Sequence, residues 1–427
     1  MPENELDVRA TVTAWPVGQG LFTSADFRVR GHDQSFRLVY DCGAGRDQAH
    51  LQTQLGEFGR SKSGEFGKPP LHLLVVSHFH FDHISGIRRL LAIDSPRLVW
   101  VSYLAPAVAT LSAVFVAAAG HEAGLDPDEI EWLVRFTLDP PSAFGGGGET
   151  PVVQIGGPVP HSHQGNGRDP DHGSLTPELD LFQDGGMISY RSEVRWETVP
   201  VVELLTWVRK PDPGLAKDAW TRLSQLPIDL TQDHLCALKE GKLSPPQANE
   251  VATLIVDAAK NEEKRKEIRK AYRAFDASLN NTSLFLMARA IDSDHSTRLA
   301  SVLPEACLHF PACIPPHCPV SKCPVCGGGA ILWCGDAEKE LLECLVDAGP
   351  KTFRALLFDT CLWQVPHHGA KSSLCSEFYH CLGWPHAFVS FGERNTFHHP
   401  NGAVLRETMA VPVTDQTQRL AYRIHWH

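Results

Sequence analysis

The stretch LHLLVVSHFHFDHISG, residues 71–86, predicts the fold of the chain around it. Its first seven residues form an apolar run that is typical of a strand buried on both faces of a parallel sheet. Three histidines and an aspartate follow within six positions, and the spacing of ISGIRRLLA behind them predicts a helix. Two interpretations compete at this point: a metal site, or a surface loop that happens to be rich in histidine.

The spacing of the polar side chains favours the metal site. His78 and His80 are two residues apart, so both point to the same side of an extended segment, while Asp82 and His83 follow at the start of the next helix. Zinc and related divalent ions accept imidazole nitrogen and carboxylate oxygen, and two such ions ~3.5–4 Å apart can share a water. Scattered surface histidines would explain neither the spacing nor the buried strand in front.

Length, composition and charge restrict what this loop belongs to. The chain has 427 residues, 43% hydrophobic and 21% charged, which is enough for one large core with an insertion or for two domains. The net charge of −11 repels nucleic acid and anionic membranes, so a polyanion would have to be attracted by a local positive feature such as bound metal. The acidic start MPENELDVRA lacks the apolar core of a signal peptide, which predicts a cytoplasmic protein.

The segment LVWVSYLAPAVATLSAVFVAAAG, residues 98–120, is long enough to cross a bilayer. Pro106 divides it into a strand-like half and an alanine-rich helical half. We therefore predict a strand followed by a helix within a buried α/β core, and no membrane partner.

Strand-like segments occur in two parts of the chain. Residues 8–45 indicate strands, and strand patterns return after residue 283 as SLFLMARAI, AILWCGD, HAFVSFG and RLAYRIHW. Between them, glycine-rich loops lead into a stretch expected to be helical from about residue 195 to residue 278. The prediction is an α/β fold whose halves are residues 1–145 and 279–427, with a loop and helical insertion at 146–278.

The helical middle contains a charged run, KNEEKRKEIRK, at residues 260–270. Charges of both signs along a helix predict a face exposed to solvent. The alternative is a basic contact for phosphate.

Three motifs, in sequence order, resemble those of the metallo-β-lactamase superfamily. SHFHFDHISG (77–86) resembles its HxHxDH signature, YDCG (40–43) its first motif and WCGDA (333–337) its Gly-Asp motif. The resemblance implies an αββα sandwich of two packed mixed sheets, with two divalent ions, zinc or manganese, at the active site. It implies the ligands His78, His80, Asp82 and His83, with Asp336 bridging the ions and Asp41 bracing the loop from behind.

The C-terminal half is similar to the ComEC-type hydrolase domains of this superfamily. NNTSLFL (280–286), VPHHGAKSS (365–373), VSFGERNTFHHPNGAVL (389–405) and VPVTDQTQRLAYRI (411–424) match that branch in order. This resemblance implies His367 and His399 as further ligands and Asn281 as a supporting residue.

The chain also departs from the superfamily pattern. Asn280 and Asn281 stand where most members have a third histidine, which leaves one ion short of a ligand unless a histidine of the pairs 367–368 or 398–399 supplies it. Alignment on His-Pro favours His399 over His398. His161 and His163 could supply a distant ligand, or they form a solvated pair in a glycine-rich loop.

The chemistry that the resemblance implies is metal-dependent hydrolysis. A water held by two cations loses its proton near neutral pH, and the same ions neutralise charge on the phosphoryl or acyl oxygen that it attacks. Asp82 would belong to this catalytic centre, and His367 or His368 could either bind metal or protonate the leaving oxygen. Lys371 and Ser372 could hold a phosphate; the alternative for Lys371 is a plain surface lysine.

A second cluster, rich in cysteine, occupies residues 307–329. Its CPVCG turn (323–327) is typical of two thiolates on one tetrahedral metal. We expect a structural zinc, without catalytic role, held by Cys313, Cys318, Cys323 and Cys326 near the rim of the active site. Buried free thiols are the alternative.

These observations favour a metal-dependent phosphodiesterase or nuclease acting on nucleic acid or a nucleotide, with a bacterial defence system as one setting suggested by analogy. One alternative is a hydrolase of a small substrate such as a cyclic nucleotide, a lactone or a thioester. Another is a catalytically weak scaffold that binds a protein partner through the helical insertion. The complete set of ligand-type residues argues against the scaffold.

Overall fold

The computed structural model describes the chain apart from the following residues: 1–7, 30–34, 62–69, 145–149, 158–173, 177–181, 185–186, 197–198, 211, 241–242, 276–278, 291–329, 349–356, 358–359, 383–384, 394, 397 and 427. The cysteine-rich segment 307–329, His161 and His163 lie outside the described residues. The structural zinc therefore stays a prediction.

The first sheet has the strand order β16-β1-β2-β3-β4-β5-β6. Its strands are β1 (Val8–Ala14), β2 (Phe22–Val29), β3 (Ser35–Cys42), β4 (Leu73–Val76), β5 (Leu98–Ser102), β6 (Val152–Ile155) and β16 (Leu420–Trp426). The pairs from β16 to β3 are antiparallel, whereas those from β3 to β6 are parallel. All four residues of β4 are buried, as expected for an apolar strand in the middle of a parallel sheet.

The second sheet has the order β15-β14-β13-β12-β11-β10-β9-β7, with β8 paired to β9. Its strands are β7 (Ser174–Thr176), β8 (Phe182–Asp184), β9 (Met187–Trp196), β10 (Val199–Arg209), β11 (Phe285–Ala290), β12 (Ala330–Trp333), β13 (Thr360–Gln364), β14 (His386–Ser390) and β15 (Val411–Val413). The strands from β12 to β15 pair in parallel. Both sheets are therefore mixed.

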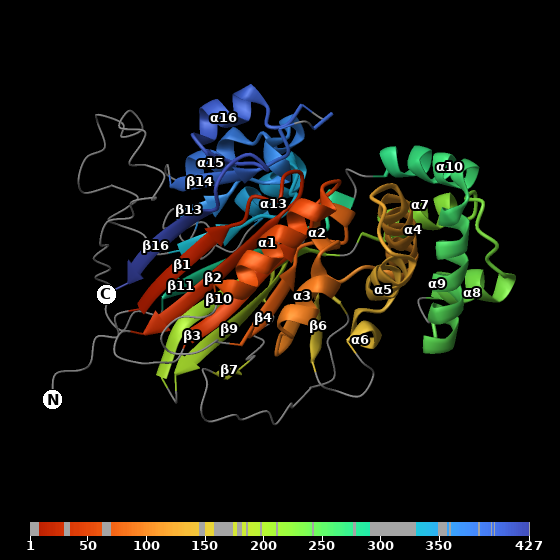
Figure 1. The fold of residues 1–427 in the computed structure, drawn as a ribbon, viewed down its shortest axis with the longest axis horizontal. Helices are drawn as coiled ribbons and strands as arrows, with labels where there is room; N and C mark the ends of the chain where they lie inside the picture. The colour runs from red at the N-terminus through yellow and green to blue at the C-terminus, as the bar shows by residue number, and fades with distance from the viewer. Residues whose placement is uncertain are drawn as a thin grey trace.

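Helices cover the outer faces of the two sheets (Figure 1). On the side of the first sheet these are α1 (Gln48–Arg60), α2 (Phe81–Ile84), α3 (Ile87–Ile93), α4 (Pro106–Glu122), α5 (Pro127–Leu138) and α6 (Pro140–Ala143). On the side of the second sheet they are α13 (Lys339–Ala348), α15 (Ser376–Leu382) and α16 (Gly402–Thr408). Four further helices pack against α4: α7 (Pro213–Leu223), α8 (Gln232–Glu240), α9 (Pro245–Lys260) and α10 (Glu262–Arg273). The 3-10 turns η4 (His367–Gly369) and η5 (Lys371–Ser373) follow β13.

Three hydrophobic cores separate these layers. The middle core contains residues of both sheets, with the rings of Tyr40 and Trp333 stacked at 5.9 Å. The other two cores lie between the first sheet and its helices, and between the second sheet and α13, α15 and α16. The αββα sandwich expected from the sequence is confirmed.

The apolar segment 98–120 also folds as expected. It forms β5 and most of α4, and nearly all of α4 is buried among other helices. Within the described chain, no helix has both the length and the apolar character that a bilayer crossing requires.

The expectation that the chain is helical from about residue 195 is wrong for its first part. Val199–Arg209 form the strand β10, which pairs with β9 and β11, and the helices begin only at Pro213. The sequence VPVVELLTWVR is rich in β-branched and aromatic residues, which suit a pleated and half-buried surface. The helices α7 to α10 then lie at one end of the molecule, beyond α4 and α5 (Figure 1).

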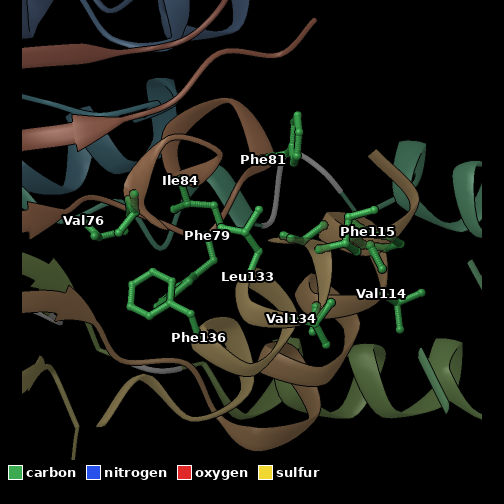
Figure 2. Close-up of a cluster of buried hydrophobic side chains, with 14 of the residues drawn as sticks. Val76, Phe79, Phe81, Ile84, Val114, Phe115, Leu133, Val134 and Phe136 are labelled. Atoms are coloured by element: carbon green, nitrogen blue, oxygen red, sulfur yellow. The ribbon is translucent and has the colours of Figure 1, made fainter. Parts of the chain in front are cut away.

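The loop after β4 is anchored by alternate side chains. Phe79 and Phe81 are buried in the core shared with α4 and α5, and Figure 2 shows them among the residues of these helices. The ring of Phe79 lies 5.4 Å from that of Phe136. Because successive side chains of an extended segment point to opposite sides, burying the phenylalanines turns His78 and His80 toward the other side.

Candidate metal centre

Asp41 holds the loop that follows β4. It is fully buried near the end of β3 and has a left-handed backbone, with φ of 55°. Its Oδ1 accepts a hydrogen bond from the Ser77 backbone N–H at 2.7 Å, and its Oδ2 accepts from Ser77 Oγ at 2.6 Å and from His83 Nδ1 at 2.7 Å. Burial raises the pKa of Asp41, although His83 and Ser77 act in the opposite direction. One carboxyl group thus fixes both ends of the histidine-containing loop.

One group of possible metal ligands consists of His78, His80 and Asp336. All three are buried, and one ligand atom of each lies within 4.8 Å of the others. The ring centroids of His78 and His80 are 4.5 Å apart. Asp336 comes from the turn after β12, so the group joins the two halves of the chain.

A second group consists of Asp82, His83 and His368, with ligand atoms that also lie within 4.8 Å of one another. Asp82 and His83 belong to the short helix α2, and His368 belongs to η4. His368 Nε2 lies 3.2 Å from Asp82 Oδ2, although 286 positions separate the two residues in the chain.

Asp336 lies between the two groups. Its Oδ1 is 3.1 Å from His83 Nε2, and its Oδ2 is 3.8 Å from both His78 Nε2 and His368 Nε2. The preceding Gly335 has φ of 56°, and a Cβ added there would lie 2.8 Å from the Cβ of Ser77. Only glycine permits this close approach, which places the carboxylate where it can contact both groups.

Hydrogen bonds fix the tautomers of three imidazoles. His83 Nδ1 faces the acceptor Asp41 and His368 Nδ1 lies 2.8 Å from the carbonyl oxygen of Ser390, so both Nδ1 atoms must carry hydrogen. Ser77 Oγ donates to Asp41, which leaves it to accept from His78 Nδ1 at 2.9 Å. In each neutral imidazole the lone pair is therefore on Nε2, which faces Asp336 or Asp82.

The carboxylates and imidazoles perturb one another strongly. Burial alone would lower the pKa of His83, but Asp336 and Asp41 raise it well above its ordinary value. The pKa of His368 is raised in the same way, against burial, by Asp336 and Asp82. Burial would raise the pKa of Asp336, but His83 and His368 hold it well below its usual range. Without ions, protons on these imidazoles supply the positive charge that the carboxylates require.

The residues present fit divalent cations. Among the described residues, His78 Nε2 is buried without a hydrogen-bond partner, and the buried His83 Nε2 and Asp336 Oδ1 face each other at 3.1 Å. Buried imidazole nitrogens and carboxylate oxygens that converge on one volume are the donor set of a cation site. Imidazole nitrogen and carboxylate oxygen suit zinc and also manganese.

The loop that carries His367 and His368 has an unusual backbone. His367, His368 and Gly369 all have left-handed φ values, 47°, 51° and 74°. Such a conformation costs on the order of 1–3 kcal/mol for a residue other than glycine and tends to occur at functional sites. The backbone N–H of His367 donates to the carbonyl of Gly335 at 3.1 Å, which ties this loop to the turn of Asp336.

His367 lies at the edge of the two groups. Its Nδ1 is 3.5 Å from Glu338 Oε1 and 3.3 Å from Ser372 Oγ, and its Nε2 is 3.5 Å from Asn280 Nδ2. Its side chain is 15% exposed, so solvent reaches it while His368 is buried.

Of the two adjacent histidines near the C-terminus, the structure brings His399 to the site. Its ring lies 5.4 Å from that of His367 and 6.5 Å from that of His368, whereas His398 is exposed. Burial and the nearby histidines lower the pKa of His399 to about 4. Asn395 holds its backbone with two hydrogen bonds, of 2.8 and 3.0 Å.

One residue expected beside the ligands, Asn281, is placed elsewhere. Lys371 is exposed on η5, next to Ser372, whose Oγ lies 3.3 Å from His367 Nδ1, and its contact with a phosphate stays a prediction. Asn281 lines a separate cavity of about 320 Å³ with Ser102 and Tyr103, and its neighbour Asn280 is the one that reaches His367. The turn before β11 determines which of two adjacent side chains faces the site, and a motif match at this position does not specify that turn.

Sequence reasoning missed residues that position the ligands. Glu338 accepts a hydrogen bond from Asn280 Nδ2 at 3.0 Å and approaches His367. The carbonyl of Ser390 and the hydroxyl of Ser77 orient two imidazoles. Ser77 and Glu338 both lie within two residues of a motif residue, which is the only signal that the sequence offers for them.

The chain is similar to known proteins over part of its length. Residues 27–175 match the family model of the metallo-beta-lactamase superfamily. A segment of 101 residues is 34% identical to ComE operon protein 3 of Bacillus subtilis (strain 168), and it covers 23% of this chain and 12% of that protein.

Two solved structures are also similar. One is a metallo-beta-lactamase with a HARLDQ motif from Cronobacter sakazakii, which is 13% identical in sequence. The match covers 62% of this chain and 86% of that chain, with a TM-score of 0.18. The other is BJP-1, a subclass B3 metallo-beta-lactamase of Bradyrhizobium japonicum, with 11% identity, 61% and 96% covered and a TM-score of 0.19. Scores this low carry no weight for the chemistry of this chain.

Proposed function

Because the chain carries a metallo-β-lactamase superfamily domain, which indicates a metal-dependent hydrolase, we propose that it is a phosphodiesterase acting on nucleic acid or nucleotides. Two divalent ions, zinc or manganese, would be held by the two ligand groups, with Asp336 between them. When bound, such ions polarise a phosphoryl oxygen and lower the pKa of a bound water.

The observation that carries the proposal is the orientation of three imidazoles. Each of His78, His83 and His368 uses Nδ1 for a hydrogen bond to oxygen, which leaves Nε2 directed at the shared carboxylates. Hydrogen bonding of this kind raises the basicity of a metal-binding imidazole and fixes its ring. A purely structural cluster would not leave the buried Nε2 of His78 without a hydrogen-bond partner.

His367 is proposed to act on the substrate. It borders the metal groups, is partly exposed, and has Glu338 and Ser372 beside Nδ1. An imidazole can carry a proton and release it, so one in this position suits proton donation to a leaving oxygen. The motifs that resemble ComEC-type hydrolase domains, including the loop of His367, support a phosphodiester substrate.

Replacing Asp336 tests the function. We expect Asp336→Asn and Asp336→Ala to lower kcat/KM for bis(p-nitrophenyl) phosphate, single-stranded DNA or RNA by more than about 100-fold, since charge stabilisation by bound ions is worth several kcal/mol. Assays should be run with zinc and with manganese. Asp233→Asn changes an exposed aspartate on α8 and is the matched control.

Metal content and folding complete this experiment. Wild type should contain two ions that Asp336→Asn retains poorly, plus one zinc if the cysteine-rich segment binds it, and circular dichroism shows whether each variant is folded. Equal rates for wild type and both Asp336 variants on every phosphodiester would refute the proposal. Activity confined to lactones or thioesters would assign the centre to another substrate class.

A further inference from the structure

The helix α10 carries four cations on one exposed face. Lys266, Arg269, Lys270 and Arg273 are spaced by three or four residues and, with Ala274, line a shallow hollow of about 470 Å³. On an α-helix this spacing places side chains on the same side. We call these four residues the basic face. They follow one another over ~10 Å of helix, given a rise of 1.5 Å per residue.

The inner side of the same helix connects the basic face to the candidate metal centre. Ile268 is buried, and the ring of Tyr272 packs 4.7 Å from that of Phe115 and 5.7 Å from that of His80. His80 belongs to the first ligand group. Arg273, at one end of the basic face, therefore directly follows a residue in contact with the metal-binding loop.

Two cations of the basic face are available for an external anion. Lys266 pairs with Glu262 and Glu263, and Arg269 lies 2.8 Å from Glu122. Within the described part of the chain, no carboxylate lies within ion-pair distance of Lys270 or Arg273. Both side chains are exposed.

The basic face carries more positive charge than its own ion pairs neutralise. Carboxylates pair with Lys266 and Arg269, and the helix dipole favours cations in the last turn, where Lys270 and Arg273 lie. The charges of Lys270 and Arg273 remain exposed in a chain whose net charge is −11. A local concentration of cations beside a candidate phosphodiesterase site would attract a polyanion that the rest of the surface repels.

We propose that the basic face of α10 binds the phosphate backbone of a nucleic-acid strand whose scissile phosphodiester lies at the histidine and aspartate cluster. This inference rests on the proposed function and specifies its substrate as a strand rather than a single nucleotide. Arg273 can contact a phosphate through two N–H groups, and Lys270 provides a point charge one turn away. The contact is independent of sequence, since it is made to phosphates only.

Charge changes on α10 test the inference. In fluorescence anisotropy with a labelled 20-nucleotide single strand of DNA or RNA, Lys270→Glu/Arg273→Glu should weaken binding at least about tenfold. The neutral variant Lys270→Gln/Arg273→Gln should reduce the slope of log Kd against log salt by ~1.4, that is ~0.7 for each phosphate that the protein no longer neutralises. Lys239→Glu, an exposed lysine on the outlying helix α8, is the matched control and should bind as wild type does.

Hydrolysis separates this inference from the proposed function. The ratio of kcat/KM for the oligonucleotide to that for bis(p-nitrophenyl) phosphate should fall at least about tenfold in Lys270→Glu/Arg273→Glu, because only the oligonucleotide reaches α10. Strand binding that depends on α10 without any phosphodiester hydrolysis would sustain the role of the basic face in binding a strand, but it would remove the proposed function and the scissile phosphodiester at the cluster. Hydrolysis of the oligonucleotide with wild-type binding and salt slope in both double variants would overturn the inference alone. Binding of an acidic protein in place of either nucleic acid would also overturn it.

Discussion

At the scale of single residues, the centre depends on groups that never touch a substrate. Asp41 accepts hydrogen bonds from His83 Nδ1 and from the hydroxyl of Ser77. That hydroxyl accepts from His78 Nδ1, and the carbonyl of Ser390 accepts from His368 Nδ1. Their effect is to present Nε2 atoms inward. Left-handed backbone is found at Asp41, His367 and His368, which are three of the five non-glycine residues with positive φ in the described chain. Backbone strain of this kind is retained where the surroundings hold it in place.

Asp41→Asn tests this arrangement. An asparagine has one acceptor oxygen and a donor group in place of the second, so it cannot accept from both Ser77 groups and from His83. We expect metal affinity, measured by competition with a chelator, to fall ~10–100-fold. The free energy of unfolding in urea should fall by about 1–3 kcal/mol, because a buried group loses its partner.

The control for this prediction is Asp47→Asn. Asp47 caps α1 by accepting from the N–H of His50 at 2.8 Å, and asparagine caps helices about as well. If Asp41→Asn binds metal as tightly as Asp47→Asn does, the orientation of His83 does not determine affinity.

At the scale of elements, local pattern predicted the strand, loop and helix that carry four of the candidate ligands, and the family resemblance predicted the two-sheet sandwich around them. The strand β4, the histidine loop after it and α3 could be predicted, because the apolar run, the spacing of the ligands and the helical periodicity follow one another directly in the sequence. Residues 199–209 were expected to be helical, although their β-branched and aromatic residues suit a strand, and pairing with β9 and β11 places them in the second sheet. The choice of Asn280 over Asn281 depends on a single turn, whereas the match to His-Pro favoured His399 over His398, and His399 is the one whose ring approaches His367.

The contact between the turn after β3 and α2 leaves no room for an added side chain. A Cβ on Gly43 would lie 2.6 Å from the backbone of Asp82 and of His83, and neither backbone can move without displacing ligands. We expect Gly43→Ala to lower both metal affinity and phosphodiester hydrolysis at least about tenfold and to destabilise the protein by about 1–3 kcal/mol, the range for overpacking.

Gly45→Ala is the matched control. Its added Cβ would meet the carbonyl oxygen of Gln19 at 3.4 Å and the Cβ of Asp82 at 3.6 Å, which are ordinary contacts. Metal titration and thermal unfolding of both variants should show the loss only for Gly43→Ala. Equal behaviour of the two variants would mean that the turn can shift without disturbing the ligands.

At the scale of the whole molecule, the centre joins both halves of the chain between two sheets, so its charge state contributes to global stability. In the metal-free protein the pKa values of His83 and His368 are raised, and those of Asp82 and Asp336 are lowered. A histidine whose pKa is raised in the folded state stabilises the fold below its unfolded pKa of about 6.5, and this stability is lost as pH rises through the folded pKa. A carboxyl group whose pKa is lowered in the folded state stabilises the fold above its unfolded pKa of about 3.9, and this stability is lost as pH falls through the folded pKa.

The remaining histidines of the centre act at acid pH. The pKa of His78 is lowered well below its ordinary value by burial and by neighbouring imidazoles, and that of His399 is lowered to about 4. The unfolded chain therefore binds more protons at these positions below about pH 6.5, and their contribution destabilises the fold as pH falls. For the centre alone, stability without metal should be greatest near pH 6.5.

The last prediction concerns how metal changes this profile. Divalent ions bind deprotonated imidazole, so they compete with the protons on His83 and His368, and this competition weakens as pH rises. We expect the Tm of protein kept in chelator to fall from pH 6.5 to pH 9, while the Tm difference between metal-loaded and chelated protein widens over the same range. Differential scanning fluorimetry at fixed metal excess measures both, and Asp336→Asn should show a smaller difference at every pH. A difference that stays constant or narrows toward pH 9 would mean that the protons and the ions do not share these imidazoles, and that the two ligand groups are not the metal centre.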